Sequence, residues 1–187
     1  MTKVLGKKQN PNKSGKSLLD PIQRNKDPIK HGIDIWNVYD FMYLDRSKMP
    51  KLRILEIIIP SSSLFTIESK SMKLYLNEFY KKSFKKDADV IKKIQKDIES
   101  ISRSTIKIKF LNKFFSEPKN IELNKLNIKN SKPNTVLKFN GFRSICPVTS
   151  QPDLANIYIY SNEGLSINWL KKYLLSYQEQ GDFHELK

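Results

Sequence analysis

The pattern of apolar and polar positions over residues 35–111 predicts a module of strands and helices. A β-branched run at 52–59 stops at a proline, as strands often do, and 61–69 continues as a turn and a short strand. Apolar side chains then recur at helical spacing over 71–84 and again after Asp87, a candidate N-cap. These helical positions are Met72, Tyr75, Leu76 and Phe79, then Ile91, Ile94, Ile98 and Ile101. Residues 104–114 alternate as a half-buried strand does, so the predicted order is strand, strand, helix, helix, strand.

The second half of the chain begins to repeat this order. Residues 112–135 are polar and rich in turn formers, which predicts a connection between two modules. In 136–187 a strand-like stretch at 156–161 precedes an amphipathic helix over 166–180, and the chain ends soon after it. The helix carries Ile167, Leu170, Leu174 and Tyr177 on one face. We therefore expect an α+β protein of two similar modules, the second incomplete, preceded by a basic, mobile arm at 1–34.

Composition narrows the class of protein. The chain has 187 residues, of which 39% are hydrophobic, enough for a real core. No apolar run approaches the roughly 18 residues that span a bilayer, and the N-terminus lacks the apolar core of a signal peptide. We therefore expect a cytoplasmic protein without a membrane partner. One cysteine and two histidines make an internal disulfide impossible and a zinc site improbable, so no metal is expected.

The net charge of +15 at first favours a nucleic-acid binder. The excess is mostly lysine, however, and it is spread along the chain rather than gathered in one patch. The lysine clusters at 81–86 and 91–96 are typical of solvated helix faces, and no aromatic-interleaved binding motif accompanies them. We therefore expect no direct nucleic-acid partner.

The stretch IESKSMKLY at 67–75 is one candidate site. Glu68, Ser69, Lys70 and Ser71 stand where a strand gives way to a helix, and a helix N-terminus favours an anion. Such a corner could hold a phosphate beside Lys70, and Glu68 could accept hydrogen bonds from a guanine-type ring. The simpler interpretation, which local physics favours, is a helix cap made by Ser69 or Ser71.

The stretch FRSICPVTSQPD at 142–153 is the other candidate and holds the lone cysteine, Cys146. An unpaired cysteine is usually buried as a small apolar side chain. Here Arg143 precedes it and a polar segment ending at Asp153 follows it, which suits a reactive thiolate and a nearby proton donor. Local reasoning leaves both interpretations open.

Several segments in order resemble one enzyme family. The segments are LGKKQN, LDPIQR, HGIDIWNVYDFMYLD with MP after it, IESKSMKLYLNEF, CPVTSQPD and FHE, spanning residues 5–185. Together they are similar to the NADPH-dependent 7-cyano-7-deazaguanine reductases, in their long, two-module form. That form carries the ESKS motif before the cysteine motif, as this chain does.

The resemblance implies a nitrile reductase of tRNA queuosine biosynthesis. Cys146 would attack the nitrile of 7-cyano-7-deazaguanine to give a thioimide, and Asp153 would donate the proton. Two hydrides from NADPH would then yield 7-aminomethyl-7-deazaguanine. The resemblance assigns Ile67, Glu68, Ser69, His184 and Glu185 to the substrate, and Ser69 with Lys70 to NADPH. The six glycines form no GxGxxG motif, which excludes a Rossmann site, and this family needs none.

The resemblance also implies the tunnel fold, or T-fold: two antiparallel-sheet modules with helices packed on one face of each. Its sites lie between modules and subunits, so a homo-oligomer, most simply a homodimer, is expected. The family continues beyond its His-Glu pair into an Arg- and Gly-rich segment that contacts NADPH, and the present sequence stops before it. We therefore expect a C-terminally shortened member. The alternative is a catalytically impaired relative that binds only substrate or a partner subunit.

Overall fold

The computed structural model describes residues 13–24, 31–113, 116–145 and 151–179. The chain divides between Phe114 and Phe115 into two units, here called unit 1 and unit 2. The division falls inside the connection predicted at 112–135, and each unit has its own cluster of buried apolar side chains.

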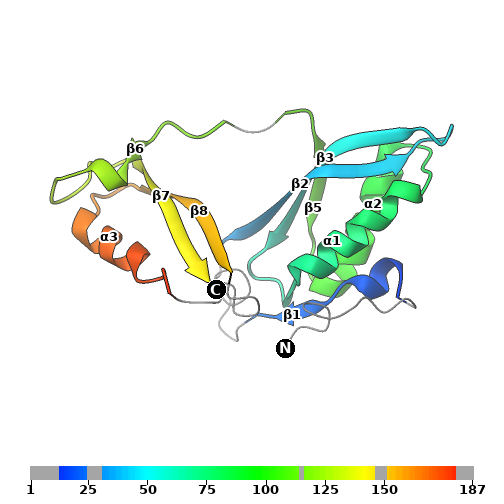
Figure 1. Cartoon of the computed structure of the whole chain (residues 1–187), viewed down its shortest axis with the longest axis horizontal. Coiled ribbons are helices and arrows are strands. Elements are labelled where there is room, and N and C mark those ends of the chain that lie inside the picture. The colour runs from blue at the N-terminus through cyan, green and yellow to red at the C-terminus, as the bar shows by residue number, and fades with distance from the viewer. Residues whose placement is uncertain (1–12, 25–30, 114–115, 146–150, 180–187) are drawn as a thin grey trace. The chain divides into compact units, whose positions relative to one another are not determined.

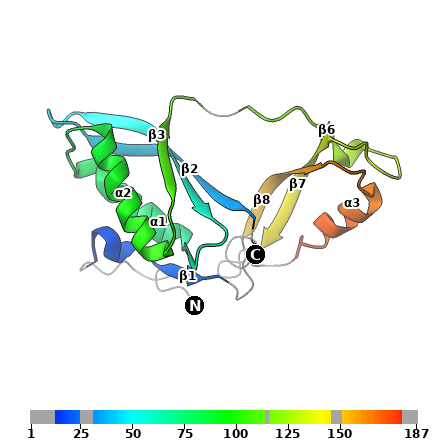
Figure 2. The ribbon, with the colours of Figure 1, turned by 180° about the vertical axis from the view of Figure 1, so that it is seen from behind.

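Unit 1 consists of a three-stranded antiparallel sheet with two helices on one face (Figures 1 and 2). The sheet order is β2 (Ile33–Leu44), β3 (Pro50–Pro60), β5 (Lys107–Leu111). The helices are α1 (Ser69–Asn77), which continues as a 3₁₀ turn η2 (Glu78–Lys81), and α2 (Asp87–Ser102). This arrangement contains the predicted order of elements and adds β2, which the sequence interpretation had not assigned.

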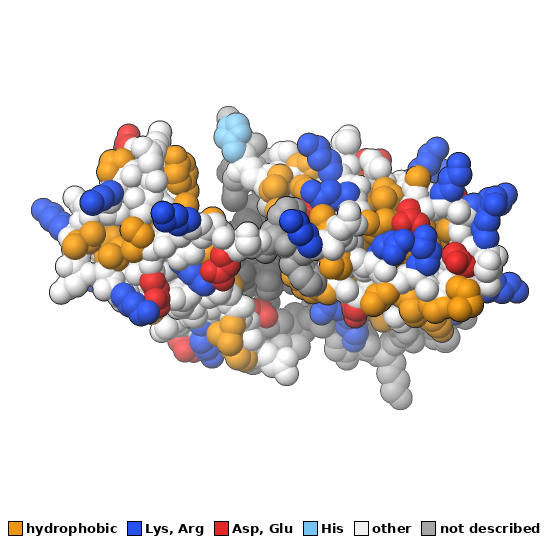
Figure 3. Space-filling model, turned by 90° about the horizontal axis from the view of Figure 1, so that it is seen from above, with side chains coloured by type: hydrophobic (Ala, Val, Ile, Leu, Met, Phe, Trp, Pro, Cys, Tyr) orange, Lys and Arg blue, Asp and Glu red, His pale blue; other side chains and the backbone are white. Residues whose placement is uncertain are grey.

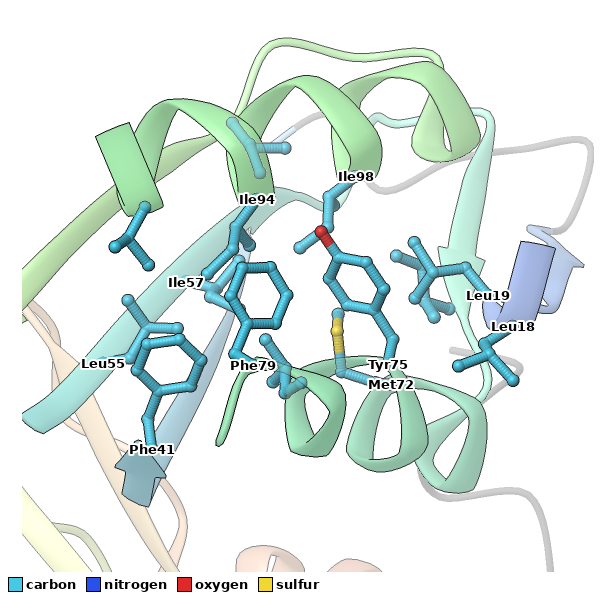
Figure 4. Packing of buried hydrophobic residues seen from close by; sticks show 14 of the residues in the cluster. Leu18, Leu19, Phe41, Leu55, Ile57, Met72, Tyr75, Phe79, Ile94 and Ile98 are labelled. Atoms are coloured by element: carbon cyan, nitrogen blue, oxygen red, sulfur yellow. The ribbon is translucent and has the colours of Figure 1, made fainter. Parts of the chain in front are cut away.

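The core of unit 1 lies between this sheet and the helices (Figure 4). The four apolar positions predicted for the first helix are at most 5% exposed, and Ile94 and Ile98 of the second are fully buried. Phe41, Leu55 and Ile57 meet them from the strands. Helical periodicity therefore identified the buried face of the first helix, whereas in the second Ile91 and Ile101 are only partly buried and Val90, which was not predicted, is fully buried.

The start of α2 differs by one residue from the expected one. Lys86 is the N-cap and Asp87 is the first helical residue, so the prediction that Asp87 caps this helix is wrong. The Asp87 carboxylate instead receives hydrogen bonds from Tyr43 and Lys51, at 2.6 and 2.7 Å, and from Arg53 at 3.2 Å. The Asp87 carboxylate therefore binds side chains of the β2–β3 pair and does not cap the backbone amides of α2.

Residues 13–24 pack onto unit 1 instead of extending from it. They form a short 3₁₀ helix η1 (Gly15–Leu18) and a strand β1 (Pro21–Gln23), which pairs antiparallel with β4 (Phe65–Ile67). Leu18 and Leu19 are each 5% exposed and belong to the core. The segment predicted as an arm thus includes residues that complete this core.

Unit 2 is built on the antiparallel pair β7 (Thr135–Ile145) and β8 (Pro152–Ser161). A short strand β6 (Ile121–Glu122) runs parallel to β7, and η3 (Leu123–Lys125) and α3 (Ile167–Leu175) supply the other core residues. The helix residues Ile167, Leu170 and Leu174 are buried, as predicted, and Tyr177 packs against them. Both units thus confirm an α+β fold with antiparallel sheets, while the incompleteness of the second module stays a prediction.

Both long strand pairs contain a bulge at a similar place. The β2–β3 register shifts between Val38 and Phe41, and the β7–β8 register shifts between Phe139 and Phe142. In β7 the bulge includes Gly141 with φ 74°, a backbone conformation that glycine adopts without strain. The shared bulge supports the interpretation of the two units as related modules.

None of the helices in the described ranges is both long enough and apolar enough to cross a bilayer.

Candidate active site

The corner between β4 and α1 holds four of the residues singled out from the sequence. Ile67 ends β4 and is 2% exposed, and Glu68 is the N-cap of α1. The two Glu68 carboxylate oxygens accept hydrogen bonds from the backbone amides of Lys70 and Ser71, at 2.8 and 2.7 Å. The Ser69 hydroxyl also donates to Glu68, at 3.4 Å. The cap interpretation is therefore right in kind, but the capping residue is Glu68 and neither serine.

The capping carboxylate is buried at the positive end of a helix. Glu68 is 1% exposed, and its side chain accepts hydrogen bonds from two backbone amides of the first turn of α1. Oε1 accepts the Lys70 amide and the longer bond from the Ser69 hydroxyl, whereas Oε2 accepts the Ser71 amide and keeps a second lone pair for another donor. The corner thus offers carboxylate acceptors in fixed positions to a ligand that carries N–H groups.

Ser71 joins this corner to the N-terminal segment. Its hydroxyl donates to the Glu68 carbonyl at 2.7 Å and accepts from the Asp20 amide at 3.0 Å, and Ser71 is fully buried. The Glu68 amide in turn donates to the Asp20 carbonyl at 2.9 Å. Residues on both sides of the β1–β4 pair therefore fix the position of Glu68.

Ser69 and Lys70 have the donor chemistry that a phosphate requires. Ser69 is exposed and Lys70 is half-buried, and both lie in the first turn of α1, where partial positive charge gathers. Within the described residues Lys70 makes no ion pair, so its ammonium group remains available. A hydroxyl and an ammonium group at a helix N-terminus are donors of the kind that bind a phosphate group.

Asp153 lies in unit 2, as the second residue of β8, and is half-buried. Its partner across the β7–β8 pair is Ser144. Cys146, His184 and Glu185 lie outside the described residues. The structure therefore brings Ile67, Glu68, Ser69 and Lys70 together in unit 1 and gives Asp153 a separate place in unit 2.

Comparison with known proteins agrees with the motifs in both units. Residues 11–110 match the family model "Nitrile reductase, 7-cyano-7-deazaguanine-reductase N-term". The chain is also similar to proteins named NADPH-dependent 7-cyano-7-deazaguanine reductase. One from Buchnera aphidicola subsp. Schizaphis graminum is 33% identical, over 90% of this chain and 77% of that protein. One from Bordetella avium is 28% identical, over 94% of this chain and 76% of that protein.

The chain belongs to the 7-cyano-7-deazaguanine reductase family. A further member, from Desulfotalea psychrophila, is 32% identical over 82% of this chain and 64% of its own length. The relatives' alignments cover most of the chain, and so extend beyond the part that the family model matches.

A groove of about 650 Å³ in unit 1 is separate from the residues that the reductase family resemblance assigns. It lies between β2 and α1 and is lined by residues of 36–42 and 72–80. None of Ile67, Glu68, Ser69 and Lys70 lines it. We therefore take the β4–α1 corner, and not this groove, as the candidate site of this reductase family member.

Sequence reasoning missed three residues at these places. Asp20 had been included in the arm, although the motif LDPIQR that contains it was part of the family resemblance. Ser71 had been weighed only as a cap, and Ser144, the strand partner of Asp153, had not been considered. The neighbourhood of Ser144 and Asp153 depends on strand register, which local sequence does not reveal.

Proposed function

We propose that this chain reduces the nitrile of 7-cyano-7-deazaguanine to 7-aminomethyl-7-deazaguanine with NADPH, within tRNA queuosine biosynthesis. The observation that carries the proposal is the similarity to reductases of that name over about nine-tenths of the chain. Glu68, Ser69 and Lys70 at one helix N-terminus, and Asp153 in a strand of unit 2, have the chemistry that the reaction needs.

In the first step the Cys146 thiolate forms a bond to the nitrile carbon, and one π bond between carbon and nitrogen breaks. Asp153 gives its proton to the nitrile nitrogen, so the product of the step is a neutral thioimide on Cys146. Two molecules of NADPH, bound in turn, would each supply one hydride, and the C–S bond to Cys146 would break between the two reductions. Ser69 and Lys70 would hold a phosphate of NADPH through their hydroxyl and ammonium groups.

The substrate ring is held by Ile67, Glu68 and Ser69 together with His184 and Glu185. The Glu68 carboxylate accepts a ring N–H with the second lone pair of Oε2, and it accepts the ring amino group at Oε1 in place of the longer bond from the Ser69 hydroxyl. Since Glu68 is only 1% exposed, the ring would reach it after the residues that cover it move.

The same proposal includes the family's tunnel fold, with sites completed between modules and between the subunits of a homodimer. It places the protein in the cytoplasm, where a nucleophilic thiol such as that of Cys146 stays reduced. Sedimentation of the purified chain would give the oligomeric state, and a monomer at all concentrations would contradict the homodimer.

The activity is tested in two assays with the purified chain. Incubation with 7-cyano-7-deazaguanine alone should add the mass of the substrate to the chain, as seen by intact-mass spectrometry. Addition of NADPH should then give NADPH oxidation and the amine product. Cys146→Ala should abolish the adduct and the turnover, and absence of an adduct with the unmodified chain would refute the proposal.

A further inference from the structure

The hydroxyl of Ser144 in β7 is buried and unsatisfied. Ser144 is 1% exposed, and within the described ranges its Oγ is the one buried side-chain nitrogen or oxygen without a hydrogen-bond partner. A buried hydroxyl without a partner destabilises a fold, and most buried polar groups find one. An alanine at this position would avoid the cost in stability. We therefore expect the Ser144 hydroxyl to form a hydrogen bond at a stage of the reaction.

Strand register puts Ser144 beside Asp153. The two residues are Cα partners in the β7–β8 pair, and directly opposed side chains share a face of the sheet. Two positions along the same strands, Phe142 pairs with Ala155, and both belong to the core of unit 2. Since side chains alternate along a strand, Ser144 and Asp153 lie on that core-facing side. Ser144 and Asp153 thus form a polar pair next to the apolar pair Phe142 and Ala155, on the same face of the sheet.

We propose that Ser144 is a positioning residue that acts through Asp153, an inference that rests on the proposed function. When Asp153 gives its proton to the nitrile nitrogen, a carboxylate is left on a partly buried side chain. The Ser144 hydroxyl rotates and donates a hydrogen bond to that carboxylate, and it keeps its own proton throughout. Cys146, the nucleophile of the proposed function, stands two residues after Ser144 in the sequence.

The Ser144 hydroxyl lowers the activation barrier of thioimide formation and hardly changes the affinity for the substrate. A hydroxyl binds a carboxylate more strongly than a neutral carboxyl group, so the bond strengthens as the proton leaves Asp153. An interaction that is stronger in the transition state accelerates the step without tightening the ground-state complex. Loss of the hydroxyl should therefore slow thioimide formation and leave substrate affinity nearly unchanged.

The test compares Ser144→Ala with the unmodified chain in single-turnover adduct formation without NADPH, followed by rapid quenching and intact-mass spectrometry. We expect adduct formation about 10-fold to 100-fold slower, the range for a hydrogen bond to a charged group. Substrate affinity, measured by calorimetry in a Cys146→Ala background, should change less than about twofold, and the melting temperature should not fall, because an unsatisfied hydroxyl is removed.

Ser131→Ala is the matched control in the same unit. Ser131 is also buried, but its hydroxyl accepts the Leu165 amide at 3.0 Å, so its removal should lower the melting temperature and leave the adduct rate unchanged. Ser144→Thr keeps a hydroxyl and should retain most of the rate. Should Ser144→Ala not fold, Ser144→Gly gives a second variant without the hydroxyl.

A double-mutant comparison separates this role from simple packing. In an Asp153→Ala background the further change Ser144→Ala should have no effect on the residual adduct rate, because the group through which it acts is gone. An adduct rate within twofold of the unmodified chain, an equal loss in Ser144→Thr, or an unchanged effect without Asp153 would each overturn the proposal. If the unmodified chain forms no adduct, the proposed function itself is refuted. If the unmodified chain forms the adduct and one of these outcomes is observed, only the role of Ser144 is refuted.

Discussion

Glu68 shows how one side chain can serve the fold and a ligand at once. Its carboxylate satisfies two backbone amides at the start of α1, and it is also the residue that the family resemblance assigns to the substrate. The position of the carboxylate is fixed before any ligand arrives. A substitution at this position should therefore affect stability and binding together.

Glu68→Gln tests this double role. The amide retains one oxygen acceptor but turns its NH₂ group toward a backbone N–H, which leaves a buried donor unsatisfied. We expect the free energy of unfolding to fall by about 1–3 kcal/mol, and calorimetric binding of 7-cyano-7-deazaguanine to weaken at least about tenfold. Lys73→Ala, on the exposed side of the same helix, is the control for urea unfolding. Unchanged stability in Glu68→Gln would contradict the capping role.

For single residues, the sequence predicted the chemical type of the candidate site better than the hydrogen bonds that its side chains make. The motif around Glu68 identified a helix N-terminus with an acidic group, and the structure has both. It did not reveal that the acidic group itself caps the helix, because Glu is an uncommon N-cap and local preference favours serine. The sequence could not reveal the unsatisfied hydroxyl of Ser144, because its burial and its strand register depend on the fold of the whole unit.

Between elements, Asp87 joins the β2–β3 pair to α2. Tyr43, Lys51 and Arg53 surround its carboxylate, and the bond from Lys51, followed by that from Tyr43, lowers the pKa of Asp87 to about 2. In the unfolded chain the pKa of an aspartate is about 4. Because the folded value is the lower one, this group stabilises the fold above pH 4, and the contribution is lost as the pH falls from about 4 to about 2.

Asp87→Asn should therefore destabilise the chain in a pH-dependent manner. At pH 7 we expect a loss of about 1 kcal/mol, a modest value because the cluster is partly exposed to solvent. Urea unfolding between pH 7 and pH 2.5 should show the difference from the unmodified chain shrinking below pH 4. Asp40→Asn, at an exposed position of β2, should show no such trend. A difference that stays constant down to pH 2.5 would exclude the ion pair as its source.

The N-terminal segment η1–β1 also contributes to the stability of unit 1. Leu19 is 5% exposed in the core of unit 1, whereas Leu64, in the turn before β4, is 46% exposed. Leu19→Ala should lower the free energy of unfolding by about 2–4 kcal/mol, and Leu64→Ala by less than about 0.5 kcal/mol. Equal effects of the two substitutions in thermal unfolding would mean that the segment does not contribute to the core.

Helices were predictable from this sequence and the two bulged strands were not. The apolar positions of α1 could be identified by spacing alone, and in α2 spacing identified Ile94 and Ile98 but not Val90. In β2 and β7 the bulge adds a residue, and the alternation of buried and exposed positions changes phase after Val38 and after Phe139. A single period of two therefore fits neither strand as a whole. Leu18 and Leu19 were missed because the polar residues around them dominate the composition of that segment.

The whole molecule has a net charge of +15. On the face drawn in Figure 3, lysine and arginine side chains lie among acidic and apolar ones on both units, and they do not form one continuous patch. Some of the 34 lysine and arginine side chains form ion pairs, such as Lys138 with Glu117 at 2.8 Å and Lys109 with Glu56 at 2.9 Å. The surface of this face thus agrees with the diffuse distribution expected from the sequence.

The two separate cores lead to a prediction for the whole chain. Buried apolar side chains form one cluster in each unit, and the cluster of unit 2 is the smaller. Leu170→Ala, in that smaller core, should remove about 2–5 kcal/mol, a large part of what so small a unit can supply. We expect faster hydrogen exchange throughout β7, β8 and α3 and little change in α1 and α2. Leu55→Ala, a fully buried counterpart in unit 1, should give the reverse pattern. If either substitution accelerates exchange equally in both units, the cores unfold as one and the chain is a single cooperative body.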